Sequence, residues 1–414
     1  MNRLDSFRRL QFSVSTIILS AVCAMAQSNS AVVLGTVNDS TGAAIVGAKV
    51  TVLNQGTNIS TTVSTKSDGQ YTVTNIDPGS YRVTATSEGF TETSVRDVTV
   101  FVNQTVRVDV SLEVGAVSTR TEVEATAPVV QSETSSIGQV VDSRQVTKMP
   151  LDGRGNLNGL LALTPGVMST GQNPLISGGV WFGSTNLTVD GVSDIDTGNE
   201  RLGPVVPSLE SIEEFKVISN GASAEFGRGG SQVLVQTKSG TNEFHGSLFE
   251  FNRNGLLAAK NFFATSLPKP PFNRNEYGAS LGGPILRNKL FFFAAFEGLR
   301  RVTAGTNITA QPTSAIKSGN FTGLSPITDP STGAPFPGNQ IPAGRISPVA
   351  QGLLKFASEP NLPGAAGGLG ANFAYNTPTR EGNDRYSGRL DYQLTSRDKI
   401  TGRYYFAGDG PYQS

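Results

Sequence analysis

The sequence predicts a mainly β protein with an N-terminal β-sandwich, a central α+β domain and an incomplete antiparallel transmembrane β-barrel. Short segments in which apolar residues alternate with polar ones recur through residues 31–114, as in strands with one buried face. Glycine and proline contribute 47 and 22 of the 414 residues, which favours many turns. Aromatic-rich segments of about ten residues, long enough to cross a bilayer as strands, follow residue 244.

Composition excludes several classes of function. Lys and Arg (33) balance Asp and Glu (33), which argues against a nucleic-acid partner. One cysteine, Cys23, and one histidine, His245, exclude a disulfide framework and nearly every Cys/His metal site. Histidine-based catalysis would depend on His245 alone. We therefore predict no catalytic residue, no metal, no cofactor and no enzymatic activity.

Residues 1–26 are predicted to be a signal peptide. Arg3, Arg8 and Arg9 precede an apolar stretch over residues 12–22, and Ala24-Met25-Ala26 follows as a cleavage pattern. The stretch is shorter than the roughly 20 residues of a spanning helix. Cleavage after Ala26 would remove Cys23. The alternative of a lipoprotein acylated at Cys23 is weakened by the bulky Val22, and a twin-arginine signal by Phe7.

Residues 31–114 are predicted to form the sandwich. Asp68-Gly69 and Pro78-Gly79 supply turns between the alternating segments. The apolar positions are Ala48, Val50 and Val52; Tyr71 and Val73; Tyr81, Val83 and Ala85; Val98, Val100 and Val102; and Val106, Val108, Val110 and Leu112.

Residues 35–52 and 68–85 resemble the carboxypeptidase regulatory-like domain in their glycines, Asp-Gly, Pro-Gly and both tyrosines. The resemblance implies a transthyretin-like or carbohydrate-binding-like sandwich. It does not imply a peptidase, because the metallopeptidase module needs more than one histidine. Asp39 and Asp68 are interpreted as turn-capping residues, the alternative being calcium ligands.

Residues 115–243 are predicted to form the α+β domain. Strands are expected over residues 186–192, 212–218 and 233–237, with an Asp-Gly turn ending the first and a Gly-rich loop at 221–230. A short helix over residues 156–167 should stop at Pro165-Gly166.

The segment IEEFKVISNGASAEFGRGGSQVLVQTK (residues 212–238), together with the earlier Asp190-Gly191, resembles the plug domain of TonB-dependent outer-membrane receptors. Phe226 stands where these plugs usually carry tyrosine. A phosphate-binding loop is excluded because it needs Gly-Lys-Ser/Thr, whereas Arg228 follows Gly227. The plug-motif residues implied by the resemblance are Asp190, Gly191, Glu213, Gly221, Phe226, Gly227, Gly229, Gly230, Thr237 and Lys238.

The resemblance also implies a TonB box, a short extended segment that an inner-membrane partner binds by strand addition. Glu124 departs from the family pattern, which has an apolar residue there. The implied partner is the TonB–ExbB–ExbD complex, and the alternative is a plain linker strand. The candidate box consists of Thr121, Glu122, Val123, Glu124, Ala125, Thr126 and Ala127.

Residues 244–414 are predicted to be barrel strands and loops. Residues 282–300 and 328–354 resemble the Oar-like subgroup of these receptors. Residues 278–282 match the G-x-S-x-G pattern of hydrolases, but His245 lies upstream of the serine, so we interpret them as barrel structure. The expected strands are 244–254, 275–285 with a turn at Gly282-Gly283-Pro284, 288–301, 385–394 and 399–407, with a large extracellular loop over 302–384.

About five strands cannot close a transmembrane barrel, because unpaired backbone groups facing lipid cost several kcal/mol each. Since plugged transporters have about 22 strands, we expect the chain to be a fragment of a longer receptor; the alternative is that edges pair between copies.

The leading hypothesis is an outer-membrane receptor or transporter with its N-terminal domain in the periplasm. It would import or sense an unidentified extracellular ligand, for which carbohydrate is one candidate, with energy transmitted from TonB. Its barrel would contact outer-membrane lipid. The alternative is a secreted or surface carbohydrate-binding or adhesion module without transport.

Overall fold

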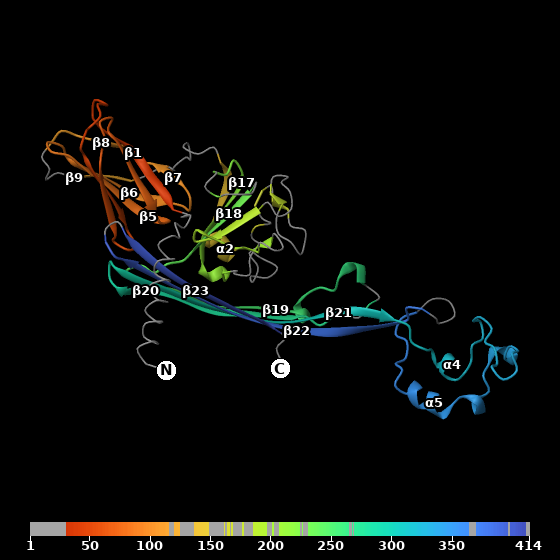
Figure 1. Cartoon of the computed structure of the whole chain (residues 1–414). Coiled ribbons are helices and arrows are strands. Elements are labelled where there is room, and N and C mark those ends of the chain that lie inside the picture. The colour runs from red at the N-terminus through yellow and green to blue at the C-terminus, as the bar shows by residue number, and fades with distance from the viewer. Residues whose placement is uncertain are drawn as a thin grey trace, which may run out of the picture. The chain divides into compact units, whose positions relative to one another are not determined.

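The structure is a computed structural model of the 414-residue chain (Figure 1). It divides into two compact units: Met1–Leu248, Gly278–Glu297 and Arg385–Ala407 form the first, and Phe249–Tyr277, Gly298–Asp384 and Gly408–Ser414 form the second. The residues described are 30–115, 120–124, 136–148, 161, 164–165, 167–168, 176–177, 185–196, 201–202, 207–223, 226, 231–264, 267, 269–363, 370–395 and 398–410.

The N-terminal region is a β-sandwich, as predicted. One sheet has the order β4-β1-β7, with β8 also paired to β1, and the other has the order β3-β2-β5-β6-β9. The strands are β1 (Ala31–Asp39), β2 (Lys49–Asn54), β3 (Ser60–Ser64), β4 (Gln70–Ile76), β5 (Gly79–Thr86), β6 (Glu92–Val100), β7 (Thr105–Arg107), β8 (Val110–Leu112) and β9 (Arg120–Glu124).

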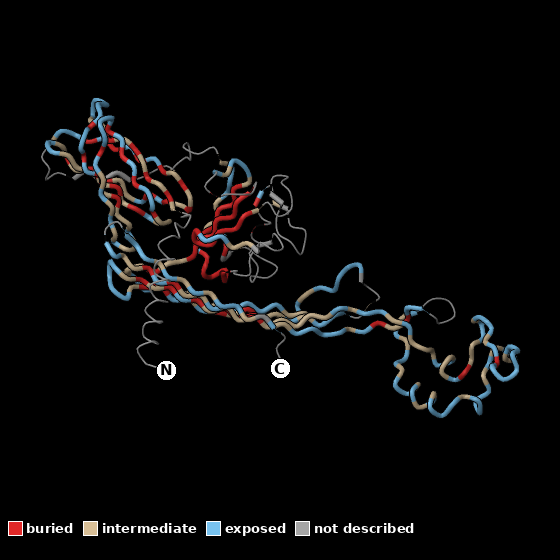
Figure 2. The backbone as a smooth tube through the Cα atoms, viewed as in Figure 1, coloured by how far each residue is buried: buried red, intermediate tan, exposed pale blue. Residues whose placement is uncertain are grey.

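Alternation along these strands builds the sandwich core (Figure 2). Val33, Val50 and Val83 have no exposed surface. The Tyr71 hydroxyl donates to the Val108 carbonyl over 2.6 Å. Asp39 accepts the Thr41 and Ala43 amides, each at 2.9 Å, so it caps a turn as expected.

One position of the sandwich prediction was wrong. The alternation extends to Val102, but β6 ends at Val100. Val102 has no exposed surface, yet its side chain joins a cluster with Ile218, Phe226 and Leu234 rather than the sandwich core. An alternating pattern predicts that a residue is buried, but it does not predict which hydrophobic core contains that residue.

A separate five-stranded sheet, called the central sheet here, has the order β10-β17-β18-β13-β14. Its β13 and β18 are parallel and its other pairs are antiparallel. All seven residues of β18 are buried, as expected for a strand covered on both faces. Its strands are β10 (Ile137–Asp142), β13 (Thr185–Val189), β14 (Val192–Ser193), β17 (Ile212–Asn220) and β18 (Ser231–Thr237); helix α2 (Ser143–Lys148) and the 3-10 helix η1 (Leu209–Ser211) accompany it.

The predicted strands and Asp-Gly turn of this region are confirmed. Asp190 and Gly191 have φ values of 50° and 85°, the left-handed conformation that such a turn needs. Most of the predicted helix over 156–167 lies outside the described residues. Two short hairpins complete the described part: β11 (Val167–Met168) with β12 (Ile176–Ser177), and β15 (Ile195–Asp196) with β16 (Arg201–Leu202).

The C-terminal region supplies another five-stranded sheet, called the long sheet here, in sequence order from β19 to β23. Five strands were predicted, and among the described residues this sheet does not close on itself. Its strands are β19 (His245–Asn254), β20 (Asn273–Leu286), β21 (Leu290–Thr309), β22 (Phe373–Gln393) and β23 (Lys399–Gly410).

The predicted turn at Gly282-Gly283-Pro284 was wrong, because β20 runs through it to Leu286. A Cβ on Gly283 would lie 2.4 Å from the Phe244 ring, and one on Gly282 would lie 2.8 Å from His245 Nε2. These glycines therefore allow side chains of β19 and the preceding residue to pack closely on the strand. The true turn is at residues 287–289, where Asn288 has a φ of 60°.

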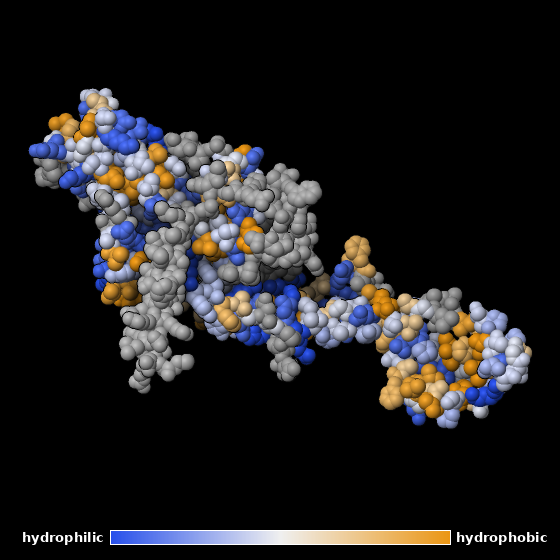
Figure 3. All heavy atoms as spheres, viewed as in Figure 1, coloured by the Kyte–Doolittle hydropathy of each residue, from blue (hydrophilic) through white to orange (hydrophobic). Residues whose placement is uncertain are grey.

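The loop predicted over 302–384 is shorter than expected and covers residues 310–372. Polar pairs extend the flanking strands: Thr306 donates to Asn376 and Asn307 to Thr377, each over 2.8 Å. The loop carries α4 (Ser314–Lys317), η5 (Pro337–Asn339), η6 (Ala343–Arg345) and α5 (Pro348–Leu354), and hydrophobic residues gather on its surface (Figure 3). The described residues include no helix of the length and apolar character needed to span a bilayer.

Candidate functional site

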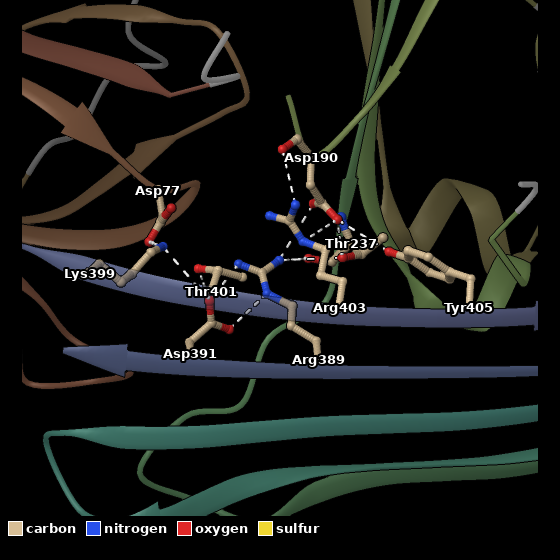
Figure 4. A network of polar contacts seen from close by, with 9 residues as sticks. All are labelled: Asp77, Asp190, Thr237, Arg389, Asp391, Lys399, Thr401, Arg403 and Tyr405. Carbon is tan, nitrogen blue, oxygen red and sulfur yellow. Dashed lines mark hydrogen bonds and ion pairs between the residues drawn. The ribbon is translucent and has the colours of Figure 1, made fainter. Parts of the chain in front are cut away.

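The candidate site is built around Asp190, in the turn between β13 and β14 (Figure 4). Aspartate tolerates the left-handed backbone that this turn requires. Its Oδ1 accepts the Thr237 amide over 2.8 Å, and its Oδ2 accepts the Thr237 hydroxyl over 2.7 Å. The carboxylate thus ties the turn to the end of β18. Its side chain has no exposed surface.

Two arginines of the long sheet face this carboxylate. Arg389 Nη1 of β22 lies 3.5 Å from Asp190 Oδ1, and Arg403 Nε of β23 lies 3.0 Å from Oδ2. The Tyr405 hydroxyl donates to Oδ2 over 3.3 Å. Arg389 also donates to the Thr237 carbonyl over 2.7 Å. The central sheet and the long sheet are therefore joined by charge-assisted hydrogen bonds.

A second carboxylate completes the cluster. Arg389 binds Asp391 through Nε at 2.7 Å and Nη2 at 3.1 Å, a bidentate arrangement. Thr401 donates to Asp391 over 2.8 Å. Lys399 lies 3.9 Å from Asp391 and 2.5 Å from Asp77, which follows β4 of the sandwich. The network thus links the sandwich, the central sheet and the long sheet.

The charges of this cluster balance. Asp77, Asp190 and Asp391 oppose Arg389, Lys399 and Arg403, so three negative groups meet three positive ones. Removing one member of a buried ion pair leaves its partner uncompensated, which costs about 3–5 kcal/mol. The cluster therefore links the central sheet to the long sheet. No group of three or more His, Cys, Asp or Glu residues suited to a metal occurs in the described part of the chain.

The structure brings together two of the predicted motif residues, Asp190 and Thr237. Lys238 instead pairs with Glu210 at 4.0 Å, and Glu213 is exposed on β17. Gly221, with φ of 69°, follows β17 directly.

Of the remaining motif residues, Gly191 is next to Asp190, and the others lie away from the ion cluster or outside the described part of the chain. Phe226 is 4% exposed, and its carbonyl accepts Asn186 Nδ2 over 3.1 Å. Gly191 shares the turn of Asp190. Gly227, Gly229 and Gly230 lie outside the described residues.

Sequence reasoning missed the positive half of the site. Arg389 and Asp391 are two positions apart on β22, as are Arg403 and Tyr405 on β23, so each pair projects to one face of its strand. Charged residues at alternate positions within a predicted membrane strand were the available signal, because such residues must face a polar interior rather than lipid.

The candidate TonB box falls partly on a strand. Thr121, Glu122, Val123 and Glu124 belong to β9, while Ala125, Thr126 and Ala127 lie outside the described residues. Strand β9 pairs in parallel with β6, with Glu92 opposite Arg120 and Arg96 opposite Glu124. It is the edge strand of its sheet.

Two family models match the chain. The outer membrane beta barrel domain matches residues 236–412, and the carboxypeptidase regulatory-like domain matches residues 32–113. The TonB-dependent transporter Oar of Myxococcus xanthus is 29% identical over 296 residues, which are 67% of this chain and 27% of that protein. The chain thus spans about a quarter of the length of this relative.

Similar solved structures include two receptors. The siderophore receptor PirA of Acinetobacter baumannii is 19% identical with a TM-score of 0.39, over 67% of this chain and 32% of that one. A mutant of the ferric enterobactin receptor PfeA of Pseudomonas aeruginosa is 18% identical with a TM-score of 0.38, over 66% of this chain and 33% of that one.

Proposed function

We propose a transport function for this chain, which is homologous to the TonB-dependent transporter Oar and contains an outer membrane β-barrel domain and a carboxypeptidase regulatory-like domain. The chain is an outer-membrane protein of the TonB-dependent receptor type, and the characterised relative is a transporter rather than an enzyme. It would import or sense an extracellular ligand whose identity remains open. The alternative of a secreted module does not account for the barrel domain.

The observation that carries this proposal is the ion cluster at Asp190. In this assignment residues 115–243 are the plug, residues 244–414 are barrel wall, and residues 31–114 are a periplasmic domain behind a signal peptide at 1–26. The contact from plug to wall runs through Asp190, Arg389 and Arg403. Charged groups of this kind can exchange their partners for water when the plug moves, so the contact can open and re-form.

Strand β9 would be the point at which force is applied. An extended segment binds a partner by adding to a sheet, using its backbone N–H and C=O groups. One edge of β9 pairs in parallel with β6, and no strand of the described residues pairs with its other edge. TonB, energised by ExbB and ExbD, would therefore bind by adding a strand at this open edge.

This function is tested by binding of a purified periplasmic domain of TonB to the full chain in detergent. Val123→Pro removes one backbone donor from β9, and it should weaken binding at least about tenfold, or by about 1.4 kcal/mol. Val46→Pro is the matched control, because Val46 is 62% exposed and lies in a turn followed by Gly47 with φ of 74°. Equal affinity of both variants and the parent would refute β9 as the box, and no binding to any of them would refute TonB coupling.

A further inference from the structure

The turn between β6 and β7, residues 101–104, contacts the central sheet. Val102 has no exposed surface and packs with Ile218 of β17, Phe226 and Leu234 of β18. It is absent from the hydrophobic cluster that forms the sandwich core. A fully buried valine contributes about 1.5–3 kcal/mol relative to an exposed one. The sandwich thus places an apolar side chain in a core that is not its own.

Two polar contacts flank this valine. The Val102 amide donates to Glu214, and Lys216 Nζ donates to the Asn103 carbonyl over 2.8 Å. Glu214 and Lys216 are only 4% and 2% exposed. Together with Ile218 they occupy alternate positions of β17, so one face of this strand meets the turn.

The backbone conformation of residues 101–104 exposes the Val102 amide and the Asn103 carbonyl to β17. Asn103 has a φ of 48°, and the Phe101 amide donates to Gln104 Oε1 over 2.9 Å. Asparagine tolerates this left-handed conformation better than most residues. The local bond satisfies the Phe101 amide, which leaves the Val102 amide and the Asn103 carbonyl to bond with β17.

We propose that residues 101–104 are a latch that docks the N-terminal sandwich onto β17 of the central sheet. Buried Glu214 and Lys216 would each lack a partner in the latch if it were withdrawn, so water must replace the latch when the sandwich leaves. Docking therefore exchanges hydration of two charged side chains for one apolar contact and two hydrogen bonds. A contact with such opposing contributions is specific and reversible. The proposal does not depend on transport, since the latch requires only the two sheets.

The latch is tested by amide hydrogen exchange, followed by mass spectrometry, on the full chain in detergent. Val102→Asp places a carboxylate in the apolar cluster and should raise exchange of residues 101–104 and of β17 at least about tenfold. Val46→Asp is the matched control, because the 62% exposed Val46 lies outside every cluster. This control should leave both segments as protected as in the parent.

A second variant covers the outcome in which Val102→Asp unfolds the sandwich, which would be seen as lost protection throughout residues 31–112. Lys216→Met keeps the length of the side chain and removes the donor to Asn103. It should raise exchange of residues 101–104 while β1 and β5 stay protected. Unchanged exchange of residues 101–104 in Lys216→Met, or in a folded Val102→Asp protein, would overturn the latch.

Discussion

Asp190 and Arg389 form an ion pair of 3.5 Å in which the two side chains are 0% and 5% exposed. The carboxylate comes from a turn of the central sheet and the guanidinium from a strand of the long sheet. Both groups also bind Thr237, at the end of β18. The pair is therefore part of a bonded unit and depends on three separate segments of chain for its geometry.

Asp190→Asn should destabilise this unit, because it leaves the buried Arg389 and the partly buried Arg403 facing a neutral amide. We expect a loss of about 3–5 kcal/mol in the free energy of unfolding, measured from urea titration of the full chain in detergent. Asp97→Asn is the matched control: Asp97 also has a left-handed φ, of 57°, but is exposed. A loss of equal size in both variants would mean that the turn, rather than the ion cluster, needs the carboxylate.

Asp77→Asn should have a much smaller effect than Asp190→Asn. The Asp77 side chain is 49% exposed, and its partner Lys399 is 29% exposed and also lies 3.9 Å from Asp391. Exposed pairs contribute about 0–1 kcal/mol and are screened by salt. The same urea titration, repeated at low and high salt, should show a small, salt-dependent loss. A loss as large as that of Asp190→Asn would show that the sandwich contact is a main support of the cluster.

Gly283→Ala should destabilise the long sheet. The added methyl group would lie 2.4 Å from the Phe244 ring, so the ring or the strand must shift. Overpacking of this kind costs about 1–3 kcal/mol. Gly388→Ala in β22 is the control, because a Cβ there meets nothing within 4 Å. The urea midpoint of unfolding should fall in Gly283→Ala and stay at the parent value in Gly388→Ala. An unchanged midpoint in Gly283→Ala would disprove the close-packing role of Gly283.

Much of this architecture could be predicted from local patterns. Alternation located most strands of the sandwich, and the Asp190-Gly191 pair located the turn between β13 and β14 of the central sheet. Both signals follow from backbone geometry within a few residues. The predicted turn at Gly282 and Gly283 was wrong because glycine occurs both in turns and in strands that pack closely on a neighbour. Only the contacts with Phe244 and His245 show that these two glycines have the second role.

The site itself depends on contacts between distant segments. Neither the pairing of Asp190 with Arg389 nor the position of Val102 in a second core follows from any local pattern. In both cases the residue type was informative, as a charge in a membrane strand or a valine in an alternating run. The residues that Asp190 and Val102 contact depend on how the sheets pack against each other, which no local pattern reveals.

The latch contact should weaken as pH rises. Burial raises the pKa of Glu214 from its ordinary 4.5 to about 8, and it outweighs the hydrogen bond from the Val102 amide, which lowers this pKa. Glu213 and Asp142 add to the rise, and Lys216 opposes it. A raised carboxyl pKa means that the contribution of Glu214 to docking is fully present below its ordinary pKa of 4.5 and is lost as pH rises to about 8. Burial lowers the pKa of Lys216, so deprotonation of this side chain favours docking as pH rises, opposite to the effect of Glu214.

The protection of the Val102 amide is the ratio of its intrinsic exchange rate to its observed exchange rate at each pH. This protection should therefore fall between about pH 5 and about pH 8. Glu214→Gln keeps an acceptor for this amide and removes the titration, so its protection should stay level over the same interval. Glu88→Gln is the control for a change of charge alone, because Glu88 lies in a sandwich turn outside the latch. A parent profile as flat as that of Glu214→Gln would mean that Glu214 does not change its protonation with docking.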